Sequence, residues 1–211
     1  IGRIPEEALP HVGGKARGLQ QLMECGLSVP GGFVVMDAGR EEAADEAAAY
    51  YAERGMGRVA VRSSATAEDG AEFSSAGQYQ TFLNVEGEEA VRHAVRGCAE
   101  SLSSMTAKVY ASMFGGSKSE QMCVVVQEMA DAEVSGVCFT QHPDGRGGLL
   151  IEAVEGLGEA LVSGHATAAA CRVDEDTLSA QDCGILSPAL VRRIAEGALK
   201  ARAHFGRELD I

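Results

Sequence analysis

The sequence has no apolar run that approaches the ~20 residues needed to span a bilayer. Its beginning lacks the basic region followed by an apolar region that marks a secretory signal. Positive charge is scarce, because 18 Lys and Arg face 31 Asp and Glu and leave a formal net charge of −13. Surfaces that bind nucleic acid or anionic membranes need clustered Lys and Arg, so the composition argues against both partners and predicts a cytoplasmic protein.

The cysteines contain no C-x-x-C pair and are scattered along the 211 residues. Several lie in apolar, strand-like runs, where cysteine behaves as a small core residue. The spacing therefore predicts neither a disulfide framework nor a zinc site. The positions are Cys25, Cys98, Cys123, Cys138, Cys171 and Cys183.

Apolar periodicity and turn residues in the first half predict alternating helices and strands. With 45% hydrophobic and 23% charged residues, the chain can bury the core of one large domain or of two small lobes. We expect helices that end at Gly26, that span about 41–54 and that begin near Gly87, and strands at 33–36, 59–62 and 81–85.

A flexible, glycine-containing break at 115–119 predicts a boundary between two lobes, residues 1–116 and 117–211. In the second lobe, the apolar runs at 122–127 and 136–140 predict a pair of adjacent strands. A further strand is expected at 149–151, and a glycine turn at 156–159 should lead into a helix. Ser187-Pro188 starts a last helix, from about 189 to 205.

Lys15 follows a glycine turn, Gly13-Gly14, at the start of a predicted helix. Free backbone N–H groups and the helix dipole favour anions there, so Lys15 is a candidate phosphate ligand. The alternative is a solvated lysine at a helix N-terminus. The P-loop pattern G-x-x-x-x-G-K-[ST] is absent.

Arg62 ends a short apolar strand and precedes three hydroxyl residues within four positions. A guanidinium at this place can bind phosphate as a fork, or it can pair with a core carboxylate. Farther on, Gly77 and its neighbours allow a backbone to approach a phosphate closely, although a tight turn before the strand at Thr81 explains the same residues.

Longer motifs in this order resemble one family. They include VGGK at 12–15, VPGGF at 29–33, VRSSATAED at 61–69, SAGQ at 75–78, TFLNV at 81–85, VVQEM at 125–129, SGVCFT at 135–140, IEA at 151–153, GLGE at 156–159 and VSG at 162–164. The chain resembles the ATP-binding domain of phosphoenolpyruvate synthase, pyruvate phosphate dikinase and rifampicin phosphotransferase. The long VRSSATAED motif carries most of the specificity, since GGK or GLGE alone would not.

The resemblance implies an α+β, ATP-grasp fold in which two α/β lobes hold ATP in a cleft between them. Lys15 and Arg62 would bind phosphate and act in catalysis. Gly77, Gln78 and Thr81 would belong to a loop that covers the phosphates. The adenine hinge would be formed by Gln127, Glu128 and Met129.

The resemblance also implies a reaction and partners. In this family a dikinase-like phosphotransferase, of the pyruvate, water dikinase type, transfers the β-phosphate of ATP to a histidine on a separate swivelling domain. That domain passes the phosphate to a small-molecule acceptor held by a further domain, in the same chain or another. The implied cofactors are ATP and Mg²⁺, and such transfer depends mostly on positioning and charge neutralisation.

The chain departs from the family at its acidic metal site, a D-I-E-W stretch. The sequence ends at Leu209-Asp210-Ile211, so Asp210 matches the first acid, and the expected second lobe is truncated at its metal-binding edge. A lone carboxylate is a poor Mg²⁺ site, because the ion wants several oxygens. The stretch from Gly39 to Val59 is also shorter than in the family, so a helix is expected to be missing.

The phosphohistidine motif is absent, because no histidine lies in a T-x-G-G…H context. We expect ordinary surface or satisfied histidines at His11, His93, His142, His165 and His204. His165 is nearest to the expected cleft. Glu152 and Glu159 could each orient the phosphate-binding arginine or cap local structure.

Two readings of function remain open besides a domain of a larger dikinase-like enzyme. One is a catalytically degenerate nucleotide-binding or interaction module, which the absent acids favour. The other is that segments outside the given chain restore the missing helix and acids. The acceptor cannot be inferred, because the domains that select it lie outside this chain.

Overall fold

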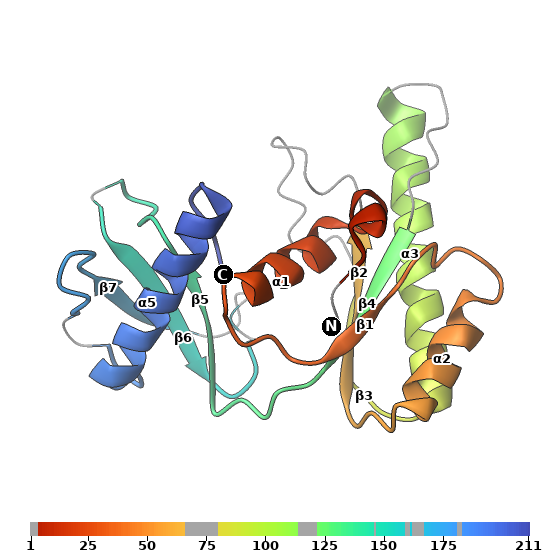
Figure 1. Cartoon of the computed structure of the whole chain (residues 1–211), viewed down its shortest axis with the longest axis horizontal. Coiled ribbons are helices and arrows are strands. Elements are labelled where there is room, and N and C mark those ends of the chain that lie inside the picture. Colours follow the sequence, from red (N-terminus) through yellow and green to blue (C-terminus); the bar gives the residue numbers. More distant parts are fainter. Residues whose placement is uncertain are drawn as a thin grey trace. The chain divides into compact units, whose positions relative to one another are not determined.

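The computed structural model of the chain describes residues 4–65, 80–113, 122–145, 147–158, 161, 167–180 and 183–211. The chain divides into two compact units. The first comprises Ile1–Met23 and Ser28–Ala130, and the second comprises Glu24–Leu27 and Asp131–Ile211. Each unit has its own sheet and its own core (Figure 1).

The first unit is built on a four-stranded antiparallel sheet with the order β1-β4-β2-β3. Valine is frequent in its central strands, where a β-branched side chain packs well on both faces. The strands are β1 (Gly32–Val35), β2 (Val59–Ala65), β3 (Thr81–Val85) and β4 (Met122–Glu128).

Helices cover both faces of this sheet (Figure 1). Val61 and Val126 lie on one face, in a core that includes buried residues of α2 (Ala43–Glu53) and α3 (Glu88–Met113). Val125 lies on the other face, in a smaller core with α1 (Gly14–Glu24) and the preceding 3-10 helix (Glu6–His11). Residues paired across an antiparallel ladder share a face, so the register puts Arg62 and Ser64 on the side of α1 and Ser63 on the side of α2 and α3.

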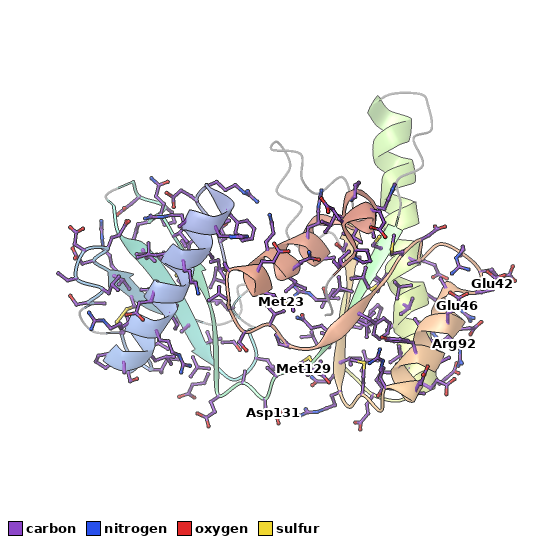
Figure 2. All side chains as sticks on the ribbon, in the orientation of Figure 1. Met23, Glu42, Glu46, Arg92, Met129 and Asp131 are labelled. Carbon is purple, nitrogen blue, oxygen red and sulfur yellow. A yellow bond between two sulfur atoms is a disulfide. The ribbon has the colours of Figure 1, made fainter. Side chains whose placement is uncertain are left out.

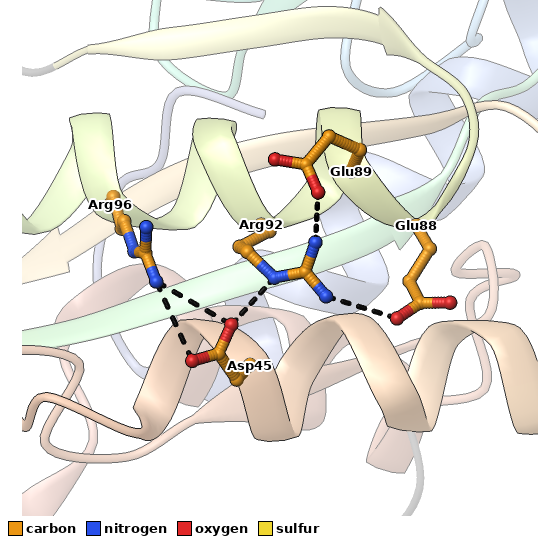
Figure 3. A network of polar contacts seen from close by, with 5 residues as sticks. All are labelled: Asp45, Glu88, Glu89, Arg92 and Arg96. Atoms are coloured by element: carbon orange, nitrogen blue, oxygen red, sulfur yellow. Dashed lines mark hydrogen bonds and ion pairs between the residues drawn. The ribbon is translucent and has the colours of Figure 1, made fainter.

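An ion-pair network links α2 to α3 (Figure 3). Arg92 donates from Nε to Asp45 at 2.6 Å, from Nη2 to Glu88 at 3.0 Å, and also to Glu89. Arg96 lies 3.5 Å from Asp45. The hydrogen bond that Arg92 donates to Asp45 is the main cause that raises the pKa of Arg92. All three partners of Arg92 are exposed, so we expect a small contribution to stability.

The second unit contains a three-stranded antiparallel sheet, β5 (Val134–Phe139), β6 (Leu149–Glu155) and β7 (Ala169–Val173), in that order. The helix α5 (Pro188–Phe205) packs with Leu149, Ile151 and Val173 to form its core. Ser187 caps α5 by accepting a hydrogen bond from the Leu190 N–H, as the Ser-Pro pair predicts.

The helices and strands expected in the first half are confirmed, and so is the last helix. The prediction of adjacent strands at 122–127 and 136–140 is wrong, since β4 pairs with β1 and β2 whereas β5 pairs with β6. The residues between them lead from one unit into the next and form no hairpin. The units accordingly divide between Ala130 and Asp131, later than the predicted boundary at 116/117, because β4 is a central strand of the first sheet.

The cysteine prediction is corrected in one respect. Cys171 and Cys183 form a disulfide, with 4.8 Å between their Cα atoms. The other four cysteines are free and buried, as expected of core residues. The strand β7 was not predicted, so the closeness of Cys171 to Cys183 could not be inferred from spacing.

No helix among the described residues is long and apolar enough to cross a membrane.

Candidate functional site

Arg62 lies on the face of the first sheet that α1 covers. It pairs with Val125 of β4 and with Thr81 of β3. Its Nε atom is buried and, within the described part of the chain, has no hydrogen-bond partner. The core-carboxylate alternative is not supported there, because no described carboxylate accepts from this Nε. A buried, unsatisfied guanidinium nitrogen is costly without a ligand or water, so it marks a candidate anion site.

The start of α1 packs against the end of β2. A Cβ added at Gly13 would overlap both the backbone and the hydroxyl of Ser64, so glycine is needed for this approach. The Ser64 side chain is fully buried, and its Oγ has no hydrogen-bond partner among the described residues. By contrast, Ser63 donates to the carbonyl of Gln80 at 3.2 Å. The positive end of the α1 dipole therefore lies beside one polar atom without a partner among the described residues, Ser64 Oγ, on the same strand and face as Arg62.

Lys15 is in the first turn of α1, as predicted. Its charge acts on the thiol of Cys98, whose Sγ lies 3.7 Å from the Val61 carbonyl and 3.5 Å from that of Gln80. Burial raises the pKa of this thiol to about 12, and Lys15 lowers it slightly. Lys15 is thus within electrostatic reach of the adjoining parts of β2 and β3, where Arg62 and Thr81 pair.

The predicted hinge residues lie at the end of β4, immediately before the division of the units. Gln127 is buried and donates from Nε2 to the Pro30 carbonyl at 3.3 Å. The backbone N–H of Glu128 donates to Gly31, and that of Met129 donates to Arg58. Both donors are used inside the first unit. A base bound along this segment would therefore have to use its carbonyls or residues beyond Met129 (Figure 2).

Gln127 pairs with Ala60, whereas Arg62 and Ser64 lie farther along the same face of β2. The four residue steps from Ala60 to Ser64 span about 13 Å at a strand's rise per residue. One strand thus carries the candidate phosphate-binding group in its middle and runs from the hinge to the start of α1. This linear order suits an extended ligand better than a compact one.

In the second unit, Glu152 lies on the sheet face opposite α5, between Val137 and Ala170. Asp210 lies beside Phe139, because the last residues pair with β5 through two hydrogen bonds between Cys138 and Ile211. The buried Thr140 hydroxyl holds this segment, accepting from the Leu209 N–H and donating to Glu208, both at 2.7 Å. The Asp210 side chain is exposed.

The described residues do not fit a complete Mg²⁺ site. Among them, no group of three or more His, Cys, Asp or Glu side chains could hold a metal ion. Asp210 provides one exposed carboxylate, whereas Mg²⁺ requires several oxygens in octahedral order. No step of the chemistry is therefore assigned to a metal held by this chain.

Several predicted site residues lie outside the described residues, namely Gly77, Gln78, Glu159 and His165. The structure pairs Arg62 with Thr81 and puts Lys15 in the first turn of α1, the helix on the side of the sheet where Arg62 lies. The sequence grouped Ser63 and Ser64 as equivalent hydroxyls, but only Ser64 is left unsatisfied. Strand alternation could have separated the two, because Ser64 shares the face of Arg62.

Comparison with known families assigns the chain. The profile of the family described as "Pyruvate phosphate dikinase, AMP/ATP-binding domain" matches residues 40–204. The chain belongs to this family, which the motifs from VRSSATAED onward predicted.

Curated relatives support the same family. The phosphoenolpyruvate synthase of Aeropyrum pernix is 33% identical over 248 residues, covering 92% of this chain and 30% of the relative. The probable phosphoenolpyruvate synthase of Methanothermobacter thermautotrophicus is 52% identical over 122 residues, which is 56% of this chain and 18% of the relative. The rifampicin phosphotransferase of Bacillus cereus is 44% identical over 122 residues, 56% of this chain and 14% of the relative. The chain thus spans less than a third of the length of these relatives.

The alignment with the Aeropyrum pernix enzyme is longer than the 211 residues of this chain. That relative therefore contains segments that this chain lacks. Among solved structures, the crystal structure of PH1788 from Pyrococcus horikoshii Ot3 is similar, with a TM-score of 0.55 at 18% identity, covering 94% of this chain and 81% of that chain. Such a likeness indicates a shared mixed α and β fold with antiparallel sheets.

Proposed function

We propose that the chain is the ATP-binding part of an ATP-grasp phosphotransferase that passes the β-phosphate of ATP to a histidine on a separate domain and then to a small-molecule acceptor. Lys15 and Arg62 bind the phosphates, with Gly77, Gln78 and Thr81 covering them. The segment Gln127 to Met129 contacts the adenine. The phosphohistidine and acceptor domains belong to the same longer chain or to a partner chain.

The observation that carries this proposal is the buried Nε of Arg62, which has no hydrogen-bond partner among the described residues. It lies beside Thr81, on the sheet face where α1 begins with Gly14 and Lys15. A phosphate would satisfy the guanidinium and would also benefit from the helix N-terminus. The membership of the pyruvate phosphate dikinase AMP/ATP-binding family supports a nucleotide as the source of that phosphate.

Calorimetric titration with Mg-ATP tests the proposal. We expect saturable binding by the wild-type chain, weakened by Lys15→Ala and by Arg62→Ala by about 1–3 kcal/mol each, since each loses a charged hydrogen bond. The dissociation constant would then rise roughly 5- to 150-fold. Arg40→Ala is the matched control, because Arg40 is exposed and pairs with Glu46 at 2.5 Å next to α2, on the opposite side of the sheet.

Equal loss of binding in Arg40→Ala would show that only general charge matters and would refute a specific phosphate site. Failure of the folded wild-type chain to bind Mg-ATP would refute the proposal itself. Circular dichroism of each variant separates a lost ligand contact from a lost fold, because Arg62 is in a central strand.

A second candidate function is a nucleotide-binding module without turnover. It is favoured by the lack of a metal-binding cluster among the described residues. Both candidates predict ATP binding, so product analysis must separate them. ATP labelled at its β-phosphate, mixed with the chain and an added phosphohistidine domain of a relative, should yield AMP and a labelled domain if the enzyme proposal holds. Binding without AMP would favour the module.

A further inference from the structure

The two sulfur atoms of the disulfide in the second unit differ in access. Cys171 is in β7 and has no exposed surface. Cys183 lies in the segment before α5 and is only partly buried against the same core. Cys183 is therefore the more accessible residue of the bonded pair.

A hollow of about 710 Å³ lies directly beside Cys183. Leu178, Gly184, Pro188 and Arg192 line it together with Cys183, whereas Cys171 does not. This volume is in the range of small-molecule sites. The hollow therefore has room for a small organic thiol next to the accessible sulfur.

The lining of the hollow includes one arginine and the first turn of a helix, two features that favour an anionic reagent. Arg192 extends along it from α5, with its side chain 60% exposed, near enough to donate to the Thr177 carbonyl at 3.5 Å and to pair with Glu196 at 3.8 Å. The first turn of α5 begins at Pro188 on the same wall, where the helix dipole is positive. Thiols react with disulfides as thiolates, so both features assist attack here.

The free cysteines contrast with this pair. Burial raises the pKa of Cys98 to about 12 and that of Cys138 to about 11, and it also raises the pKa of Cys123. These thiols stay protonated and enclosed at neutral pH, which makes them poor nucleophiles. Among the described cysteines, the bonded pair is thus the element suited to thiol chemistry.

We propose that Cys183 is a thiol-exchange site, at which a low-molecular-weight thiol enters through the Arg192-lined hollow and opens the Cys171–Cys183 disulfide. The incoming thiolate forms a bond to Sγ of Cys183, and the Cys171–Cys183 bond breaks. Its electron pair leaves on Sγ of Cys171, which takes a proton from water. A second thiolate attacks the sulfur of the first thiol and releases Cys183, so two thiols become one disulfide while the protein gains two thiols.

Opening the bond changes the segment between β7 and α5. Val173 bridges to Ala180, and Asp174 accepts from the Thr177 N–H at 2.9 Å. Neither contact involves a sulfur atom of the disulfide, so we expect both to remain when the bond opens. Leu178 has a φ of 53°, a left-handed conformation that is unfavourable for leucine. Without the covalent closure we expect this segment to loosen. The site makes the second unit responsive to thiols, and it does not depend on the proposed ATP chemistry.

Reduced glutathione, added to the oxidised native chain and quenched with acid, tests the proposal by peptide mass mapping. We expect the first adduct on Cys183, with Cys171 recovered as a free thiol. Arg192→Gln should slow the adduct several-fold, whereas the neighbouring Arg193→Gln, exposed and outside the hollow, should not. An adduct on Cys171, no adduct without denaturation, or equal rates in both arginine variants would overturn the proposal.

Reciprocal serine variants give a second measurement that does not need the disulfide. Oxidised glutathione should modify Cys183 in Cys171→Ser, but should leave Cys171 unmodified in the folded Cys183→Ser variant. Modification of both sulfurs at equal rates would contradict the difference in access. So would recovery of Cys171 and Cys183 as free thiols after the wild-type chain has been treated with an oxidant.

Discussion

The two units are both antiparallel sheets with helices, but they are stabilised and charged differently. The sheet of the first unit has helical cores on both faces, whereas α5 is the helix that the structure describes on the sheet of the second. The first carries the cationic candidates Lys15 and Arg62, and the second carries the carboxylates Glu152 and Asp210. The disulfide belongs to the second unit.

The comparison indicates that the two units are stabilised in different ways, because their sheets differ in size and in the number of covering helices. A sheet covered on both faces buries enough apolar surface to need no covalent link. A smaller sheet with fewer covering helices gains less from burial, and a cross-link that restricts the unfolded chain offsets part of that difference. The cations of the first unit agree with the proposed function, because phosphate binding needs cationic side chains.

Reduction of the disulfide should produce the largest effect. The bond closes a sequence separation of 12 residues, and its loss should destabilise the second unit by about 3 kcal/mol. Hydrogen exchange with and without a reductant measures this, with amides of β6 and β7 losing protection while those of β2 and β4 do not. Equal loss in both sheets would break the comparison, because it would mean that the units unfold as one. A Cys171→Ser/Cys183→Ser variant, insensitive to the reductant, is the control.

Tyr51→Phe should be the next largest effect and should act on the first unit. The Tyr51 hydroxyl is partly buried, donates to the Gly57 carbonyl and accepts from the Gly87 N–H, both at 3.0 Å. Its removal leaves two turn groups unsatisfied and should cost about 2 kcal/mol in urea unfolding. Tyr50→Phe, at the neighbouring surface position, should change stability by much less. If Tyr51→Phe and Tyr50→Phe lowered the stability equally, the Tyr51 hydroxyl would not link the turns at Gly57 and Gly87.

Alkaline pH should weaken both units through buried thiols. Burial raises the pKa of Cys98, in the first unit, to about 12 from its ordinary value of 9.0, and that of Cys138, in the second, to about 11. Between 9.0 and its raised folded pKa, each thiol has lost its proton in the unfolded chain but keeps it in the folded chain. The contribution of each buried thiol to stability is therefore fully present below pH 9 and falls as pH rises. The slope should reach about 1.4 kcal/mol per pH unit for each thiol.

Unfolding midpoints measured from pH 8 upward in Cys98→Ser and Cys138→Ser check this, because serine does not titrate in the range. As pH rises, the stability of each variant should fall less steeply than that of the wild type. The contribution of Cys138 should end at a lower pH than that of Cys98, because the folded pKa of Cys138 is lower. Parallel curves for a variant and the wild type would mean that the thiol ionises normally in the folded chain.

Most elements could be predicted where periodicity and a terminal glycine coincide. The helix α2 ends at Glu53, with Arg54 as its C-cap before Gly55, which has a φ of 59°, and Ser187 caps the start of α5. Pairing between strands could not be predicted, because an apolar run such as β4 does not specify its neighbours. The strand β7 was missed since Ala169–Val173 has small or polar side chains at several positions.

The site was predictable in part for a related reason. Arg62 and Lys15 could be proposed from local motifs, although Arg62 lies in the middle of β2 and not at the strand end that the sequence predicts. Their proximity depends on Gly13 fitting against Ser64, which is a contact between distant segments. The backbone N–H groups of Glu128 and Met129 donate to Gly31 and Arg58, which are also distant in the sequence. These hydrogen bonds could therefore not be predicted from the motif VVQEM.

The smallest effect should come from the Arg92 network, and it sharpens the contrast between surface and core in the first unit (Figure 3). Asp45→Asn removes the carboxylate that Arg92 and Arg96 share, yet Asp45 is 55% exposed. Exposed pairs contribute at most about 1 kcal/mol, so the loss should be below that value. It should disappear in about 1 M salt, where the Debye length falls to about 3 Å. A double-mutant cycle with Arg92→Met isolates the pair, and coupling that persisted in salt would indicate a buried hydrogen bond in place of a screened ion pair.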